Sequence, residues 1–255
     1  MVNKIVESVD EAVRDIRDGS VIGIGGFGYA GTPFALLKAL ARREPKPRDL
    51  TLVGVALRQF THLASVGAVK KVITTYPGWP GALRTKLEAK DPVTQGYLRG
   101  EIEVEIVPQG NYVERLRAAG AGIPAFYTPV GAGTELGEGK EVRVFDGVEC
   151  ILERALKLDY ALIRAHKADR YGNLVYRGTT RAHNPIMAMA ADITIVEVDE
   201  IVELGEIDPE AVVTPGIFVK RVVKAPKDDP YDFYREFFYD EMKDFLDYLH
   251  ARRGK

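Results

Sequence analysis

Cysteine is almost missing from this sequence: Cys150 is the only one in 255 residues, which excludes a framework of intramolecular disulfides. Its apolar neighbours predict a small, buried side chain. Long apolar runs are missing too, because charge or glycine interrupts each of them well short of the roughly 20 residues that a membrane span needs. The opening residues, MVNKIVESVD, contain no apolar run like that of a signal peptide. We therefore expect a cytoplasmic protein with no membrane partner.

An excess of positive charge is also lacking. Lys and Arg number 35 against 37 Asp and Glu, so the formal net charge is -2 and the pI is about 6.2. This balance argues against a nucleic-acid partner that depends on a strong basic field, and it leaves room for an acidic small-molecule substrate. Histidine is scarce and scattered, so no metal site is expected; the four histidines are His62, His166, His183 and His250.

The chain does contain an alternation of helical and strand patterns, which is typical of a mostly parallel sheet covered by helices. Ser8 and Glu11 form a capping box for a helix ending near Gly19, and Thr32 as N-cap with Pro33 predicts the start of another. We predict an α/β fold with an open, mostly parallel sheet and helices on both faces. Strands are predicted at residues 21–24, 50–55, 72–75, 102–107, 160–166, 174–177, 193–198, 201–204 and 217–223, and further helices at 59–67, 91–99, 111–119 and 184–191.

No long linker rich in Pro, Gly or Ser divides the chain, so we predict one domain over residues 1–228. Residues 229–255 form a separate tail, in which apolar side chains recur near helical spacing between Asp232 and Leu249. The charges of this tail are of both signs. It is therefore predicted to be an amphipathic helix that docks on protein, with a membrane anchor as the alternative.

Residues 23–28 satisfy the pattern G-x-G-x-x-G directly after a predicted strand. A dinucleotide-binding loop would also place an acid about 20 residues further on, closing the next strand. Here the strand at 50–55 runs into Ala56, and the glycines continue to Gly31 before the helix starts. The residues therefore disfavour a dinucleotide, and a tight turn with no ligand is the plainer alternative.

A longer string around this loop is more specific. From Asp18 to Pro33 the sequence has the form DG, an apolar strand, and then GGF-x-x-x-G-x-P. This string resembles the first signature of family I coenzyme A transferases. Further matching strings put the resemblance over roughly residues 5 to 225, and together they look like the alpha subunit of a two-subunit 3-oxoacid or acetate type coenzyme A transferase. These strings are residues 100–110, 117–129, 165–173 and 190–202.

The sequence departs from the family pattern in three places. Gly23 stands where the family usually has an apolar residue, which should loosen the strand end. Residues 54–58, GVALR, replace Ser-Asn-Asn-Ala-Gly after the second strand, and Gly78-Trp-Pro80 replaces Gly-Glu-Asn after the third. The last two lie at strand ends, where open α/β sheets bind ligands. They bear on the substrate more than on the fold, and Trp79 is expected in the acyl pocket or at an interface.

The resemblance implies a reaction in which a glutamate carboxylate attacks a thioester and forms first an anhydride and then an enzyme thioester. In the family this glutamate belongs to the other subunit of the pair, in a Ser-Glu-Asn-Gly-like segment that this chain lacks. No catalytic residue is therefore expected here, with Glu135 and Glu203 as the alternatives within the chain. The substrates implied are a coenzyme A thioester and a carboxylate, with no permanently bound cofactor.

The expected contribution of this chain is to supply donors where negative charge develops on oxygen. The backbone N–H groups around Gly25, Gly26, Phe27 and Gly28 suit this role, and the Phe27 ring is either a wall of the acyl pocket or a core filler. Gln109, placed at a strand end, matches the position where the family has an amide facing the acyl carboxylate. The alternative for Gln109 is an amide that braces a turn.

The function implied is that of the alpha subunit of an acyl-CoA:carboxylate coenzyme A transferase. The implied partner is the coenzyme A transferase subunit that carries the catalytic glutamate, in a heterodimer or a dimer of heterodimers. A thioester or ring-opening hydrolase built on the same pair is one alternative, with water replacing the second acid. A non-catalytic subunit that binds acyl-CoA is another. The charged cluster at residues 164–170 is expected on a solvated or subunit-facing surface, with a coenzyme phosphate site as the alternative.

Overall fold

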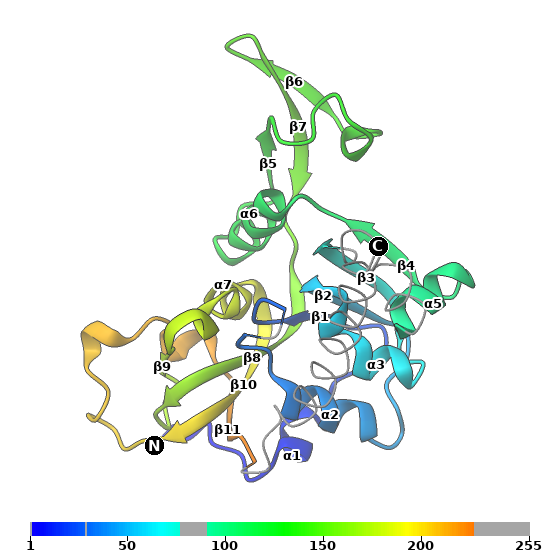
Figure 1. The fold of residues 1–255 in the computed structure, drawn as a ribbon. Coiled ribbons are helices and arrows are strands. Elements are labelled where there is room, and N and C mark those ends of the chain that lie inside the picture. The colour runs from blue at the N-terminus through cyan, green and yellow to red at the C-terminus, as the bar shows by residue number, and fades with distance from the viewer. Residues whose placement is uncertain (1, 29, 77–90, 227–255) are drawn as a thin grey trace, which may run out of the picture.

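The computed structural model describes residues 2–28, 30–76 and 91–226. Its centre is an eight-stranded sheet with the order β11-β10-β8-β1-β2-β3-β4, in which β9 pairs with β8 (Figure 1). Every neighbour along this order is parallel, and only β9 is antiparallel. The predicted fold class is confirmed. The strands are β1 (Val21–Ile24), β2 (Leu50–Ala56), β3 (Val69–Tyr76), β4 (Glu103–Ile106), β8 (Leu158–Ala168), β9 (Leu174–Val175), β10 (Ala191–Ile201) and β11 (Arg221–Lys224).

Helices cover both faces of this sheet, because each face carries its own apolar core. The core on one face is formed with α1 (Val9–Val13), α2 (Phe34–Arg42), α3 (Thr61–Ser65) and α5 (Pro92–Leu98), and the core on the other with α6 (Gln109–Gly120) and α7 (Asn184–Ala190). Ile22 and Ile24 of β1 belong to the first core, whereas a side chain on Gly23 would collide with Met187 of α7. Gly23 pairs in register on both sides. It therefore admits α7 close to the sheet and does not loosen the strand end, contrary to our expectation.

The first helix is shorter than predicted. The capping box exists: Ser8 Oγ accepts a hydrogen bond from the N–H of Glu11, and the Glu11 carboxylate accepts one from the N–H of Glu7. However, α1 ends at Val13 and does not continue to Gly19. The guanidinium of Arg43 donates to the carbonyls of residues 13, 14 and 16. These long-range bonds satisfy carbonyls that a longer helix would have paired internally.

The start of α2 also differs from the prediction. Pro33 is the N-cap residue, and Thr32 makes no capping bond but donates through Oγ1 to the carbonyl of Gly28 at 2.9 Å. The N–H of Leu36, in the first turn, instead donates to the carboxylate of Glu197, 161 residues further along the chain, at 2.9 Å. A local pattern could not reveal this cap, because its acceptor belongs to β10.

A second sheet was not predicted at all. β5 (Ala125–Thr128), β7 (Val148–Arg154) and β6 (Val142–Phe145) pair antiparallel in the order β5-β7-β6. Figure 1 shows this sheet projecting from the main body beyond α6. Asp146 and Gly147 join β6 to β7 with positive φ values of 51° and 80°, as a two-residue hairpin requires. This Asp-Gly turn was the sequence signal for the hairpin. Cys150 lies buried on β7, as predicted.

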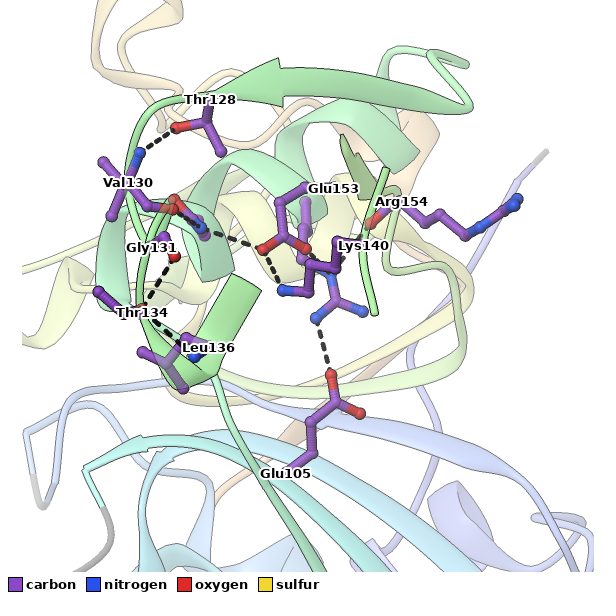
Figure 2. A network of polar contacts seen from close by, with 11 residues as sticks. Glu105, Thr128, Val130, Gly131, Thr134, Leu136, Lys140, Glu153 and Arg154 are labelled. Atoms are coloured by element: carbon purple, nitrogen blue, oxygen red, sulfur yellow. Dashed lines mark hydrogen bonds and ion pairs between the residues drawn. The ribbon is translucent and has the colours of Figure 1, made fainter. Parts of the chain in front are cut away.

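A buried carboxylate attaches this second sheet to α6. Glu153 of β7 accepts hydrogen bonds from Lys140 Nζ at 2.7 Å and from Asn111 Nδ2 at 3.1 Å. Arg115 Nε lies 3.9 Å from the same carboxylate, and its Nη1 donates to Glu105 at 2.9 Å (Figure 2). The network thus joins the second sheet to α6 and to β4, which is an edge strand of the main sheet.

Smaller differences concern connections. Residues 202–204 are not a strand, because β10 ends at Ile201; residues 216–218 form a short helix before β11. The 3-10 helices are η1 (Leu57–Gln59), η2 (Glu135–Gly137), η3 (Gly178–Arg181), η4 (Pro209–Ala211) and η5 (Gly216–Phe218). The predicted tail helix and Trp79 lie outside the described residues. Within the described ranges, no helix is long and apolar enough to cross a bilayer.

Candidate functional site

The glycine loop, residues 25–33, lies at a switch point of the main sheet. β1 has β2 on one side and β8 on the other, and the chain runs outward from β1 in both directions (Figure 1). Open α/β sheets bind ligands at the carboxyl ends of their strands at such a point. Two other segments meet the loop there: η1, which follows β2, and the start of α7. The loop is therefore the structural candidate for a ligand site.

Glycine is required in the loop for shape. Gly26 has a φ of +90°, and a Cβ there would come within 2.6 Å of the N atom of Thr32. A Cβ on Gly25 would collide with Asn184 Oδ1, and one on Gly31 with the carbonyl of Thr180 and with Asn184. The loop thus passes against η3 and α7 more closely than any other residue type would permit.

The carbonyl groups of the loop are held by side chains from other parts of the chain and from the loop itself. Each bond occupies an acceptor that would otherwise be open to a ligand. The bonds run from Gln59 Nε2 to Gly25 O (2.8 Å), from His183 Nδ1 to Gly26 O (3.2 Å), from Thr32 Oγ1 to Gly28 O (2.9 Å) and from Asn184 Nδ2 to Gly31 O (3.0 Å). Four carbonyls of the loop are therefore already paired with side chains and do not face a ligand as a group.

The N–H groups of the loop are not equivalent. Gly25 donates to the carbonyl of Leu162 on β8 at 2.9 Å, and Phe27 donates at 2.9 Å to the carbonyl three residues on. Neither is free for a ligand in this arrangement. For Gly26, which is buried, the structure records no acceptor among the described residues; the same holds for the more exposed Gly28. Of the predicted donors, Gly26 and Gly28 remain.

Three aromatic rings line up beside the loop. The Phe27 ring is 51% exposed and stacks on His183, with centroids 6.0 Å apart and planes at 19°. His183 meets the buried Tyr112 of α6 edge-on at 5.8 Å. Because the acceptor of His183 Nδ1 is a carbonyl, Nδ1 carries the proton, and burial lowers the pKa of this histidine. Phe27 is therefore not a core filler, and its role as a pocket wall stays a prediction.

Gln109 lies at the predicted end of the sheet but is not adjacent to the glycine loop. It is the first residue of α6, three positions after the last residue of β4. β4 is three strand spacings from β1, about 14 Å across the sheet. Its side chain is exposed, and no hydrogen bond to a described residue is recorded for it. The turn-bracing alternative thus has no support, and a substrate contact by Gln109 stays a prediction.

The two alternative glutamates also lie away from the loop. Glu135 is exposed in η2, on the segment that connects β5 to β6. Glu203 is exposed just beyond β10; its neighbour Ile201 pairs with Ala168, six residues further along β8 than the residue that pairs with β1 at Ile24. Six residues of strand span about 20 Å. The structure brings neither carboxylate to the loop.

The charged cluster at 164–170, which we expected on a solvated or subunit-facing surface, is buried in part, since Arg164 and Asp169 are less than a tenth exposed. Arg164 donates to Glu197 at 2.9 Å and to Asp199 at 2.6 Å. Glu197 is fully buried, and burial raises its pKa to about 7 against the opposing effect of Arg164. Since this carboxylate also accepts the N–H of Leu36, it fixes the start of α2 at the end of the glycine loop. Sequence reasoning missed it, because its partners are distant in the chain.

Gln59 and Asn184 are the other residues near the loop that sequence reasoning missed. Asn184 packs on Gly25 and donates to Gly31 O, and Gln59 donates to Gly25 O. The only signal for Gln59 was its place directly after the departure at residues 54–58.

Among the described residues, no group of three or more His, Cys, Asp or Glu side chains could hold a metal ion.

Known proteins resemble this chain over nearly all of its described residues. Residues 6–225 match the family model described as Coenzyme A transferase. A subunit of the 3-oxoadipate CoA-transferase of Pseudomonas putida is 48% identical over 227 residues, which cover 88% of this chain and 94% of that protein. A subunit of the succinyl-CoA:3-ketoacid coenzyme A transferase of Helicobacter pylori is 43% identical, with coverage of 88% and 94%.

Solved structures give the same architecture. The glutaconate coenzyme A-transferase of Acidaminococcus fermentans superposes with a TM-score of 0.74 at 22% identity, over 88% of this chain and 76% of that one, which is evidence for the fold alone. The decarboxylase AibA/AibB superposes with a TM-score of 0.72 at 28% identity, over 88% and 84%. The fold therefore occurs with more than one chemistry, so the reaction has to be argued from the site.

Proposed function

Because this chain belongs to the coenzyme A transferase family, we propose that it works as the alpha subunit of an enzyme that moves coenzyme A from an acyl thioester to a carboxylate. The observation that carries the proposal is the identity of 48% to a 3-oxoadipate CoA-transferase subunit along 94% of that relative. The names of these relatives suggest succinyl-CoA as donor and a 3-oxo acid as acceptor. The site is proposed to operate in the cytoplasm.

A partner subunit supplies the nucleophilic glutamate in this proposal. Its carboxylate attacks the thioester carbonyl and expels the coenzyme A thiolate, leaving a mixed anhydride. The thiolate then attacks the enzyme's acyl carbon, releases the first carboxylate and forms the enzyme thioester, which the acceptor acid opens by the same two steps in reverse. The exposure of Glu135 and Glu203 and their distance from the loop support a nucleophile outside this chain.

This chain contributes hydrogen-bond donors to the tetrahedral intermediates of that reaction. Negative charge develops on the former carbonyl oxygen, and a preorganised N–H group in a dry site stabilises it. The N–H of Gly26 fits this role because it is buried and has no acceptor among the described residues. The exposed ring of Phe27 would line the acyl group, and the amide of Gln109 would reach the distal carboxylate of a diacid substrate. No resident cofactor is needed, since coenzyme A enters as a substrate.

The test is to purify the chain with its native partner and to measure transfer of coenzyme A from succinyl-CoA to a 3-oxo acid by mass spectrometry of the thioesters. Transfer that requires the acceptor acid supports the proposal. Loss of the thioester without an acceptor would favour the hydrolase, and binding of acyl-CoA without turnover would favour the non-catalytic role.

A second measurement locates the nucleophile. After incubation with acyl-CoA alone, the mass of one coenzyme A, less water, should be added to the partner and not to this chain. Addition to this chain would instead assign the nucleophile here, and Glu135 and Glu203 would be replaced first.

A further inference from the structure

The peptide that joins Gly25 to Gly26 has no intrinsic reason to hold one orientation. Neither residue carries a Cβ, and Gly26 has a φ of +90°, which glycine adopts about as readily as a negative value. The N–H of this peptide is the buried donor that the proposed function assigns to the reacting oxygen. Its direction must therefore be set by a group outside the peptide.

Gln59 makes the shorter of the two hydrogen bonds that the carbonyl of this peptide accepts; the other, from Thr32 Oγ1, is 3.4 Å long. Its side chain is fully buried, and Nε2 donates to the carbonyl of Gly25 at 2.8 Å and to Thr32 Oγ1 at 3.2 Å. Among the described residues, the only cis peptide is that between residues 44 and 45, so the Gly25–Gly26 peptide is trans. In a trans peptide the C=O and N–H bonds point in opposite directions. A bond that draws the Gly25 carbonyl towards Gln59 thus aims the N–H of Gly26 away from it.

Gln59 is itself held at its other end. Oε1 accepts hydrogen bonds from the N–H of Val55 at 2.8 Å and of Ala56 at 3.1 Å, at the end of β2. Gly54 leaves room for this arrangement, since a Cβ there would lie 2.9 Å from the ring of Phe60 and 3.1 Å from Gln59 Oε1. Residues 54–58 are where the sequence departs from the family pattern. The departure thus accommodates a side chain that reaches back to the glycine loop.

We infer that Gln59 is a positioning residue, which fixes the Gly25–Gly26 peptide so that the N–H of Gly26 points at the oxygen that becomes charged in the reaction. The inference rests on the proposed function and names a residue outside the segments that carry the family resemblance. A purely structural brace would be the rival role. The two roles differ in what is lost when only the donor half of the amide is removed.

The variant Gln59→Glu makes this separation. It keeps the shape and the oxygen that accepts from Val55 and Ala56, but it replaces the donor that holds Gly25 O with an acceptor. In the complex with the native partner, kcat should fall about 10- to 100-fold, because an N–H that points elsewhere no longer stabilises the charge that develops in the transition state. KM for the acyl thioester should change less than about threefold.

Ser20→Ala is the matched control. It removes a side-chain bond to a backbone carbonyl, from Ser20 Oγ to Arg17 O at 2.7 Å, next to the opposite end of β1. Its kcat should stay within about twofold of the wild type, as expected for a lost bond remote from the reacting atoms. If Gln59→Glu keeps a kcat within about twofold of the wild type, or if both variants lose activity in parallel, the positioning role is overturned.

A crystal structure of Gln59→Glu decides the inference without turnover. A Gly25–Gly26 peptide rotated from its present orientation supports it, and an unchanged peptide overturns it. If the wild-type complex transfers coenzyme A to no acceptor, the proposed function fails, and the peptide orientation alone then decides whether Gln59 positions the loop.

Discussion

The glycine loop after β1 and the antiparallel sheet β5-β7-β6 differ in how each is held. Four side chains, from η1, α7 and its N-cap, and the loop itself, bond to loop carbonyls, and Gly25, Gly26 and Gly31 are buried. In the antiparallel sheet all four residues of β6 are exposed, and Val144 is 61% exposed. That sheet is attached to the body through the Glu153 network (Figure 2). The loop is therefore held by side chains from several elements, whereas the side-chain contacts that join the sheet to α6 are polar and centre on Glu153 and its neighbour Arg154.

Gly26→Val should have the largest effect, since it strikes the most constrained point. A β-branched residue at a φ of +90° is strained, and its Cβ would meet the backbone of Thr32 and Gly31. Turnover should fall by about a hundredfold or more while the subunits still associate, as native mass spectrometry can check. Gly19→Ala is the control: its φ is also positive, at +72°, no atom lies within 4 Å of a Cβ there, and it precedes β1 at the end away from the loop. A wild-type rate in Gly26→Val would remove the loop from the mechanism.

Glu153→Ala should detach the antiparallel sheet and leave the body folded. The variant removes the buried carboxylate that Lys140 and Arg115 face. Removing one partner of a buried ion pair typically lowers the free energy of unfolding by about 3–5 kcal/mol. Hydrogen exchange should show protection lost in β5 and β7 and kept in β1 and β8. Glu149→Gln, an exposed acid on the same strand, should change stability by less than about 0.5 kcal/mol. Equal exchange in both variants would mean that the sheet is held by other contacts.

The stability of the body should depend on pH through His62. Burial lowers the pKa of this histidine from 6.5 to about 4, so the unfolded chain binds its proton at a higher pH than the folded chain does. Its contribution is thus fully present above pH 6.5 and is lost as the pH falls towards 4, up to about 3 kcal/mol. Denaturant unfolding at several pH values should show that the free energy of unfolding decreases less on acidification in His62→Leu than in the wild type. Parallel pH profiles for the two proteins would contradict this assignment.

Gln109→Ala tests the junction between the two regions, because Gln109 opens the helix that carries Asn111 and Arg115. If its amide contacts the substrate, the variant should lose about 1–3 kcal/mol of transition-state stabilisation, measured as a decrease in kcat/KM. Thermal stability should be unchanged, because the side chain is exposed. The effect should be larger for an acceptor with a distal carboxylate than for acetate. An unchanged kcat/KM for both acceptors would exclude Gln109 from the site.

The sequence predicted the strands next to the glycine loop correctly and missed the antiparallel sheet. The strands next to the loop were predicted because each is a short apolar run between turn signals, as at residues 21–24 and 50–55. The antiparallel sheet was missed because β5 is only half buried and all four residues of β6 are exposed, although Asp146-Gly147 marked its hairpin. Periodicity reports burial, so it fails where a strand is not buried against its own chain.

The sequence by itself determined the family, the parallel sheet and the place of the glycine loop, because glycine spacing, apolar runs and matching strings are local properties. Only the tertiary structure decided that the amides of Gly26 and Gly28 are left without an acceptor among the described residues, and which side chains hold the loop around them. Gln59 reaches Gly25 across 34 residues, Asn184 reaches Gly31 across 153, and Glu197 reaches Leu36 across 161. Bonds of that separation exist only after the strands have paired, so no local pattern encodes them.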